Sequence, residues 1–419
     1  MPAGRTVLLG ACGGIALYKV PLLISRLREL GADVQVVMTE AATKFVSPLT
    51  FQTVSGNPVH TDLFAPPERW NVEHVALAER ADLAVVAPAT ANIIGQAAGG
   101  LAEDFLSTTL LALTCPVLFV PAMNVNMYGH PAVKRNIETL RGFGHEVMEP
   151  DTGRLASGSI GAGRYPETER ILAACLRLLG PGDFRGVKVV VTAGPTREPF
   201  DPVRFVSNPS TGRMGYALAA EARERGAEVV LISGPSELPA PHEVRLVKVT
   251  TTAEMREALA GEIESAGVVV MAAAPADFAP ARAAGRKLKK GELDLNVVFA
   301  LTPDIIREVG EKKRASGSSR PILVGFAAET HDLLASARAK LAAKNLDLIV
   351  ANPVAGDAAA GFGSETNRIA ILGRDGEAEE LPLLSKREAA RAVFDRVARL
   401  LLDQTNGPRT EGGGRCGRA

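Results

Sequence analysis

The residues with the clearest chemical potential in this chain lie in loops that follow short apolar runs. A glycine-bearing turn at residues 10–14 follows the run 6–9, and a loop rich in Gly, Pro, Ser, Thr and Asn follows the run 187–192. Helix-like patterns come next, at residues 18–30 and from residues 211–214 onward. The start of a helix presents unpaired backbone N–H groups that suit an anion. Both loops therefore predict sites for phosphate-bearing ligands.

The first turn lacks the fingerprint of a dinucleotide site. Its sequence, Gly-Ala-Cys-Gly-Gly, is not G-x-G-x-x-G, so it indicates a dinucleotide only weakly. Glu40 follows the apolar run 34–38, where an acidic residue could bind a ribose. An acidic residue in the first turn of a helix explains Glu40 better.

Polar segments follow two further apolar runs. Residues 88–92 follow the run 82–87, and residues 121–127 follow the run 117–120. Ligands bind at the carboxyl ends of strands in open α/β sheets, so both segments are candidate ligand contacts. A glycine-rich segment at residues 151–167 is either a linker or a mobile flap over a site, and its composition does not separate these alternatives.

Three polar residues are ambiguous when each is taken alone. His74, in a predicted helix at residues 71–80, is more typical of a surface or capping residue than of a catalyst. Asn124 is more typical of a turn, and Lys287 of a solvated basic run. On a strand, Lys287 and Lys289 would share one face.

The elements that position these residues alternate between strands and helices, as in parallel α/β proteins. Residues 26–39 and 221–234 repeat one order: helix, Gly-Ala-acid-Val, strand. We predict an α/β fold with two doubly wound, Rossmann-like domains at residues 1–180 and 187–404, and a disordered tail at residues 405–419. Local patterns also predict a helix at 101–113, a polar surface connection at 311–320, a hairpin turn at 373–376 and a closing helix at 386–402.

The composition argues against several classes of protein. The 47 basic and 47 acidic residues balance, which argues against a nucleic-acid or membrane-surface partner. No apolar run reaches the ~18–20 residues that cross a bilayer, and the chain starts directly in a predicted strand, without a signal-peptide pattern. The 4 cysteines show no spacing for zinc or disulfides. We expect a cytoplasmic protein from a reducing compartment.

Many short motifs together resemble one family. The motifs GGIALYK, MTEAATKFVSPLTFQTVSGNPV, APATANII and PAMNVNM, then TAGPTREPFDPVRFVSN, TGRMG, PADF, KLKK, LTPDI, GFAAET and KNLDLIVAN, are similar to those of bifunctional coenzyme A biosynthesis proteins. That family fuses a phosphopantothenoylcysteine decarboxylase to a phosphopantothenate–cysteine ligase. The resemblance covers residues 5–402, and the order of the motifs makes it specific.

The resemblance implies FMN in the first domain. It implies that FMN oxidises the substrate thiol to a thioaldehyde, that CO₂ then leaves to give an enethiolate, and that reduced FMN returns the hydride. His74 matches the catalytic histidine, and Asn124 matches the asparagine that orients the substrate carboxylate. The FMN-binding positions implied are Gly10, Gly13, Thr39, Thr90, Asn92 and Ser107.

Ser157 departs from the family's pattern. The family carries Ala-Cys-Gly in the flap, and its cysteine donates a proton when the enethiolate is reduced; this chain has Ser157 there. A thiol has a pKa of about 8.5, and an alcohol is far less acidic. Three alternatives follow from this substitution. Ser157 suffices together with a water or another acid, or the final reduction is slow, or the domain releases an oxidised enethiol. The intact motifs favour the first alternative; in the others the ligase alone is fully active.

In the second domain the resemblance implies amide synthesis driven by CTP. The 4'-phosphopantothenate carboxylate forms an acyl-cytidylate and pyrophosphate, and the cysteine amine displaces CMP to give 4'-phosphopantothenoylcysteine. Asn208 matches the residue that contacts the acyl-nucleotide, and Lys287 the lysine needed to form it. Mg²⁺ is the default metal for a triphosphate. The nucleotide-binding positions implied are Asp277, Lys287, Pro303, Asp304, Ile305, Ile306, Phe326, Lys340 and Lys344.

Two substitutions and two rival functions complete the sequence-based prediction. Arg213 replaces the family's lysine before Met-Gly, and Pro275 replaces a small apolar residue and removes one backbone N–H. The resemblance implies homo-oligomers, with trimers of the first domain and dimers of the second. An NAD(P)-dependent oxidoreductase is disfavoured by the missing fingerprint. A non-enzymatic interaction protein would not explain an intact ligase half.

Overall fold

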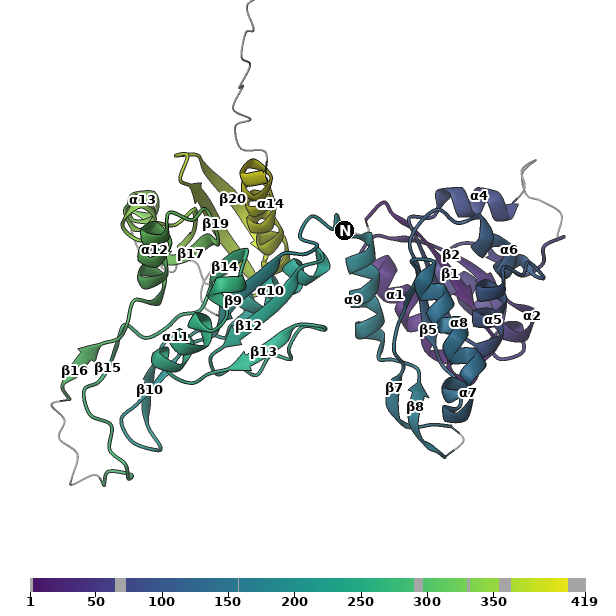
Figure 1. The fold of residues 1–419 in the computed structure, drawn as a ribbon, viewed down its shortest axis with the longest axis horizontal. Coiled ribbons are helices and arrows are strands. Elements are labelled where there is room, and N and C mark those ends of the chain that lie inside the picture. Colours follow the sequence, from purple (N-terminus) through teal and green to yellow (C-terminus); the bar gives the residue numbers. More distant parts are fainter. Residues whose placement is uncertain are drawn as a thin grey trace, which may run out of the picture. The chain divides into compact units, whose positions relative to one another are not determined.

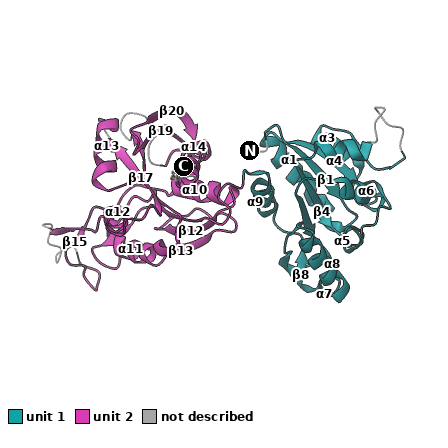
Figure 2. Ribbon diagram, turned by 45° about the horizontal axis from the view of Figure 1, so that its top comes forward, with its two compact units in different colours: residues 1–181 teal, residues 182–419 magenta. Residues whose placement is uncertain are grey.

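The computed structural model describes residues 3–64, 73–156, 158–289, 297–329, 332–353 and 363–405. The chain divides into two compact units, Met1–Pro181 and Gly182–Ala419, which Figure 2 shows in different colours. Each unit contains a largely parallel sheet with helices on both faces, so the predicted fold class is confirmed. Ser157 and most of the predicted tail lie outside the described residues.

The sheet of unit 1 has the strand order β3-β2-β1-β4-β5-β6, with parallel neighbours throughout. This is the order of a Rossmann sheet, which changes its direction of winding between its first and fourth strands and leaves a crevice at their carboxyl ends. The strands are β1 (Thr6–Ala11), β2 (Asp33–Met38), β3 (Val59–His60), β4 (Leu83–Ala89), β5 (Val117–Pro121) and β6 (Glu146–Val147).

Both faces of this sheet are buried under helices (Figure 1). Val7 and Leu9 belong to one apolar cluster and Leu8 to the other, because successive side chains of a strand point to opposite faces. One face packs against η1 (Ile15–Lys19), α1 (Val20–Glu29), α3 (Pro48–Ser55) and α9 (Thr168–Leu179). The other packs against α4 (Glu73–Arg80), α5 (Ala91–Gly99), α6 (Phe105–Ala112) and α8 (Pro131–Gly142).

Unit 2 repeats the same winding and extends it. Its sheet has the order β13-β12-β9-β14-β17-β18-β19-β20, and the last two strands are antiparallel. The repeated segments found in the sequence occupy equivalent places, since α1–β2 and α10–β12 each follow the first strand of their sheet. The strands are β9 (Lys188–Ala193), β12 (Glu228–Ser233), β13 (Arg245–Lys248), β14 (Val268–Met271), β17 (Ile322–Glu329), β18 (Leu348–Pro353), β19 (Thr366–Gly373) and β20 (Ala378–Ser385).

Helices cover both faces of this second sheet as well. The helices α10 (Arg213–Glu224) and α14 (Lys386–Thr405) share one apolar cluster. The other face carries α11 (Thr252–Ala260), α12 (Ile305–Ser316) and α13 (Leu333–Ala343). The predicted hairpin turn lies between β19 and β20, and the predicted closing helix is α14.

Three hairpins project from the sheets. The segment that the sequence left open as linker or flap forms the antiparallel pair β7 (Asp151–Arg154) and β8 (Ile160–Arg164). In unit 2, β10 (Arg197–Pro199) pairs with β11 (Phe205–Ser207), and β15 (Phe278–Pro280) pairs with β16 (Phe299–Leu301).

Two predicted boundaries are wrong for physical reasons. The helix expected at 101–113 begins only at Phe105, because the Asp104 side chain caps it by accepting a hydrogen bond from the Ser107 N–H. The connection expected at 311–320 is largely helical, since α12 continues to Ser316. Its polar residues cover an exposed face, while Val309 and Lys313, four residues apart, are buried.

Candidate functional sites

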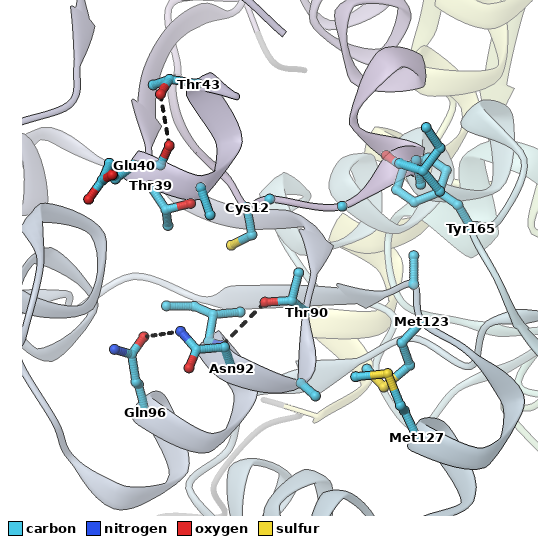
Figure 3. A pocket seen from close by; sticks show the side chains of 18 of the residues that line it. Cys12, Thr39, Glu40, Thr43, Thr90, Asn92, Gln96, Met123, Met127 and Tyr165 are labelled. Carbon is cyan, nitrogen blue, oxygen red and sulfur yellow. Dashed lines mark hydrogen bonds between the residues drawn. The ribbon is translucent and has the colours of Figure 1, made fainter. Parts of the chain in front are cut away.

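Unit 1 contains a cavity of about 1480 Å³ at the carboxyl ends of β1, β4 and β5, hereafter cavity 1. This is the edge at which the winding of the sheet reverses. The loops that the sequence singled out meet here, namely the glycine turn, the segment after β4 and the segment after β5 (Figure 3). The cavity is large enough for a nucleotide-sized cofactor together with a substrate.

The glycine turn fits closely against the start of α2 (Glu40–Thr43). A Cβ atom at Gly13 would lie 2.6 Å from the Ala41 Cβ and 2.9 Å from the Ala41 carbonyl oxygen. The Thr39 hydroxyl caps α2 by accepting a hydrogen bond from the Ala42 N–H at 3.2 Å. The turn therefore requires glycine, and it leaves backbone groups facing the cavity.

A chain of polar side chains lines the β4 side of cavity 1. The Thr90 hydroxyl caps α5 by accepting from the Ile93 N–H at 3.4 Å. The Asn92 amide donates to the Gln96 carbonyl oxygen at 3.3 Å (Figure 3). The Gln96 amide in turn donates to the Glu103 carboxylate at 3.0 Å. These contacts fix the orientation of the amides and leave the Asn92 carbonyl oxygen as a candidate ligand acceptor.

The β7–β8 hairpin is attached to the turn that carries Asn124. The Met123 N–H donates to the Gly163 carbonyl oxygen at 3.0 Å, and a Cβ atom at Gly163 would lie 2.2 Å from the Met123 carbonyl oxygen. Gly163 has φ +142°, a conformation that favours glycine. Asn124 itself caps α7 (Val125–Gly129), because its side chain accepts from the Asn126 N–H at 2.9 Å.

Not every predicted FMN contact lines cavity 1. Gly13, Thr39, Thr90 and Asn92 do, and so does Asn124, the predicted contact of the substrate carboxylate. Gly10 lies within β1, where a Cβ atom would meet the Leu106 side chain at 2.6 Å, so this glycine serves packing. Ser107 is 1% exposed, and its hydroxyl is used in the α6 capping box with Asp104.

His74 does not itself line cavity 1, but it packs against Phe105, which does. The His74 and Phe105 rings form a T-shaped contact with their centroids 6.2 Å apart. His60 stacks on the same Phe105 ring at 5.5 Å and contacts the Glu73 carboxylate at 3.2 Å. No local sequence pattern marked His60, because it approaches His74 only in the fold, where both rings contact Phe105.

A buried thiol that the motif did not predict also faces cavity 1. Cys12 is 1% exposed and lies inside the glycine turn. Burial raises the pKa of the Cys12 thiol to about 12, with a smaller contribution from the Asp104 charge, so the thiol is protonated near neutral pH. A protonated, buried thiol is a packing group here and a poor nucleophile.

Unit 2 contains a cavity of about 430 Å³, hereafter cavity 2, at the carboxyl ends of β14, β17 and β18. The N-termini of α10 and α12 both open onto it. The residues of cavity 2 that match predicted positions are Asn208, Asp277, Pro303, Asp304, Ile305, Ile306, Phe326, Lys340 and Lys344.

An ion pair lies at the start of α12. The Asp304 side chain caps this helix and contacts the Lys344 ammonium at 2.9 Å. Burial opposes ionisation of Asp304, but the hydrogen bond and charge of Lys344, together with hydrogen bonds from Arg307, outweigh it and hold the pKa of this carboxyl below its usual range. Asp304 is therefore ionised at neutral pH, and the pair lies where a polar ligand can reach it.

Asn208 braces the loop after β14. Its amide nitrogen donates to the carbonyl oxygens of Ala274 at 3.2 Å and Pro275 at 2.9 Å. The amide hydrogens are thereby used within the protein, and the carbonyl end is left for a ligand in cavity 2. Pro275, which lacks an N–H, thus contributes through its carbonyl group.

Lys287 does not line cavity 2, and the segment 287–289 is not a strand, so the predicted shared face with Lys289 is wrong. Leu288, between them, is held at both backbone groups. Its N–H donates to the Asp201 carboxylate at 3.1 Å, and its carbonyl accepts from the Arg204 guanidinium at 2.9 Å. Asp201 also pairs with Arg204 at 2.6 Å. These contacts of Leu288 with Asp201 and Arg204, hereafter the Leu288 clip, hold the middle of the segment 287–289 against the loop between β10 and β11.

We expect Asp201→Ala to release this lysine segment. The change removes the acceptor for the Leu288 N–H and the partner of Arg204, so trypsin should cut after Lys287 and Lys289 roughly tenfold faster than in the unmodified chain. Glu308→Ala, which removes a different ion pair of unit 2 with Arg256, is the control. Equal cleavage rates in all three proteins would show that the clip does not hold the segment.

Cavity 2 also contains polar residues that the motifs did not include. Asn367, near the start of β19, and Lys386, which starts α14, both lie far along the chain from the motif loops. They meet because β19 is antiparallel to β18, which brings its start to the carboxyl edge of the parallel strands. No short-range sequence signal marks such a convergence.

Three negative findings apply to the described part of the chain. Its acidic, histidine and cysteine residues form no cluster of three or more that could hold a metal ion. Cys12, Cys115 and Cys175 are free thiols. Among the described helices, none is both long and apolar enough to cross a membrane.

Comparison with known proteins gives matches to both units. Residues 1–180 match the family model for "Flavoprotein", and residues 184–401 match "DNA/pantothenate metabolism flavoprotein C-terminal domain". The Bacillus subtilis (strain 168) "Coenzyme A biosynthesis bifunctional protein CoaBC" is 48% identical over 400 residues, which cover 94% of this chain and 97% of that protein. The protein of the same name from Escherichia coli (strain K12) is 42% identical, covering 94% and 97%.

A solved structure of a CoaBC C-terminal domain is 37% identical, with a TM-score of 0.45, and covers 53% of this chain and 99% of that one.

Proposed function

Because this chain belongs to the family of coenzyme A biosynthesis bifunctional proteins, we propose that it catalyses two successive steps of coenzyme A synthesis. Unit 2 couples 4'-phosphopantothenate to cysteine, and unit 1 decarboxylates the product to 4'-phosphopantetheine. The observation that carries this proposal is that each unit has its own cavity at the carboxyl edge of its sheet, lined by the motif residues of the corresponding half.

The ligase step takes place in cavity 2. The carboxylate oxygen of 4'-phosphopantothenate attacks the α-phosphorus of CTP, forms an acyl-cytidylate and expels pyrophosphate. The amine of cysteine then attacks the acyl carbon, forms the amide and expels CMP. A carboxylate is a poor electrophile, and the mixed anhydride provides the leaving group that direct amide formation lacks. Mg²⁺ accompanies the triphosphate and keeps several of its waters.

The residues of cavity 2 divide this work. Asp304 and Lys344 bind the polar groups of the nucleotide, supported by their ion pair and by the N-terminus of α12. Asn208 holds the Ala274–Pro275 backbone and presents its carbonyl oxygen to the acyl-nucleotide. Lys287 reaches the α-phosphate only after a movement of its segment about the Leu288 clip, and its charge then stabilises the transition state.

The residues of cavity 1 fit FMN. The close approach of Gly13 to Ala41 leaves backbone groups open at the turn, Thr90 starts a helix beside it, and Asn92 offers an amide. Bound FMN supplies a reversible two-electron oxidation of the substrate's thiol carbon. Asn124 donates from its amide to the substrate carboxylate and thereby places the bond that breaks. His74 holds or moves a proton after a small approach past Phe105.

The described surface supports self-association. Tyr18 and Leu22 of unit 1 are 64% and 54% exposed, and Val298 and Leu301 near the β15–β16 hairpin are 73% and 88% exposed. Apolar side chains exposed in groups mark protein interfaces. The chain forms homo-oligomers, with trimers of unit 1 and dimers of unit 2. Analytical ultracentrifugation of the full chain checks this, and a monomer at working concentration contradicts it.

The cofactor and the nucleotide are tested separately. Acid-released flavin, identified by mass spectrometry, should be FMN in about one copy per chain by the proposed stoichiometry. Pyrophosphate release with 4'-phosphopantothenate should require CTP in preference to ATP. A colourless protein that reduces NAD(P)⁺ would instead support a nicotinamide-dependent oxidoreductase.

Ser157→Cys tests the departure from the family. Ser157 adjoins Ala156, which lines cavity 1. We expect the variant to form 4'-phosphopantetheine within about threefold of the unmodified rate, because a water or another acid supplies the proton. Stopped-flow monitoring of flavin reoxidation checks this with supplied 4'-phosphopantothenoylcysteine. A much larger acceleration would show that Ser157 limits the final reduction.

A further inference from the structure

Lys386 is an ammonium in cavity 2 that has no acidic partner among the described residues. It is the first residue of α14, it is half-buried, and it lines the cavity. Its ammonium donates to the Thr366 carbonyl oxygen at 3.5 Å, the long limit of a hydrogen bond, and it forms no ion pair with any described residue. A half-buried cation without a counter-charge is costly unless a ligand supplies one.

The neighbourhood of Lys386 adds positive potential. Arg213, the first residue of α10, faces Lys386 and pairs with Glu365, which is largely exposed. Gly212 precedes α10 in the left-handed region, and no side chain caps this helix. The first N–H groups of α10 therefore remain for another acceptor. Burial, followed by the Arg213 charge, holds the pKa of the Lys386 ammonium below its usual range.

Asn367 provides a second, independent sign of a missing ligand. It is 4% exposed, it lines cavity 2, and its carbonyl oxygen accepts no hydrogen bond within the described structure. A buried carbonyl oxygen without a donor is rare because it costs the desolvation of that oxygen. A protonated phosphate oxygen, or a water bound to the phosphate, would donate to it.

We propose that Lys386 and Asn367, together with the uncapped N-terminus of α10, form a phosphate subsite of cavity 2. The subsite lies on α10, β19 and α14, whereas the Asp304–Lys344 pair lies on α12 and at the end of α13. The inference rests on the proposed ligase function. Two substrates carry the required chemistry: the triphosphate tail of CTP and the phosphate of 4'-phosphopantothenate.

Binding measurements on Lys386→Met test the subsite. Titration calorimetry of the full chain with Mg²⁺-pyrophosphate should show affinity reduced about 10- to 100-fold, because one charged hydrogen-bond donor is lost. If the triphosphate tail occupies the subsite, CTP weakens by a similar factor and 4'-phosphopantothenate does not. If the substrate phosphate occupies it, the pattern is reversed. Asn367→Leu should weaken the same ligand.

The controls separate this inference from the proposed function. Lys312→Met removes a lysine of α12 outside cavity 2 and should leave every affinity unchanged. Lys386→Arg keeps the charge and should restore much of the binding, and thermal unfolding shows whether each variant is folded. If folded Lys386→Met binds pyrophosphate, CTP and 4'-phosphopantothenate as the unmodified chain does, the subsite is wrong, even where the unmodified chain makes both products.

Discussion

Asn124→Asp is expected to stop the second step of the reaction while the first continues. With 4'-phosphopantothenate, cysteine, CTP and Mg²⁺ supplied, the variant should accumulate 4'-phosphopantothenoylcysteine and form 4'-phosphopantetheine at least ~100-fold more slowly, the typical effect of losing one positioned donor. Aspartate can still accept the hydrogen bond from the Asn126 N–H that caps α7. It cannot donate to the substrate carboxylate, and its charge repels that group.

The design of this variant separates chemistry from folding. Asn124→Leu would also remove the cap, and its loss of activity would have two explanations. Asn126→Leu alters the neighbouring exposed side chain, which does not line cavity 1, and should leave both rates unchanged. Retained FMN in the aspartate variant shows that the cavity is intact. Normal decarboxylation by that variant would contradict the role assigned to Asn124.

Asn208→Asp should produce the opposite defect. A carboxylate at this position would face the carbonyl oxygens of Ala274 and Pro275 without hydrogens to donate, so the loop that lines cavity 2 would be repelled. We expect pyrophosphate release and amide formation to fall together by roughly 100-fold or more. Supplied 4'-phosphopantothenoylcysteine should still be decarboxylated at the normal rate, since unit 1 is unchanged.

Mixing the two variants provides an internal check. The Asn124→Asp protein makes the intermediate, and the Asn208→Asp protein consumes it, so the mixture should form 4'-phosphopantetheine although neither protein does so well alone. Product release is measured by mass spectrometry over time. Failure of the mixture, with each half-reaction active in its own assay, would contradict the exchange of a free intermediate between units.

Much of the fold was predictable because it depends on local patterns. The buried parallel strands appear as short apolar runs, and glycine and proline mark their ends. The repeated helix–strand segments indicated two similar sheets, which share the first six positions of their strand order. The start of α6 was missed because Asp104 caps the helix with a side chain whose role depends on geometry.

Candidate site residues were predictable only where the motif and the cavity coincide. Gly13, Thr90 and Asn92 line cavity 1, as their loops at strand ends suggested. Gly10 belongs to the same glycine-bearing segment but packs against Leu106, because it still lies within β1, before the turn begins. Lys386 reaches cavity 2 through an antiparallel strand pair, which is a long-range feature that no local pattern encodes.

One chain is expected to perform both steps. The most direct test is incubation of the pure protein with 4'-phosphopantothenate, cysteine, CTP and Mg²⁺, with products identified by mass spectrometry. We expect pyrophosphate and CMP first, transient 4'-phosphopantothenoylcysteine, and then 4'-phosphopantetheine with CO₂. Absence of 4'-phosphopantothenoylcysteine, together with failure to decarboxylate it when supplied, would contradict the account.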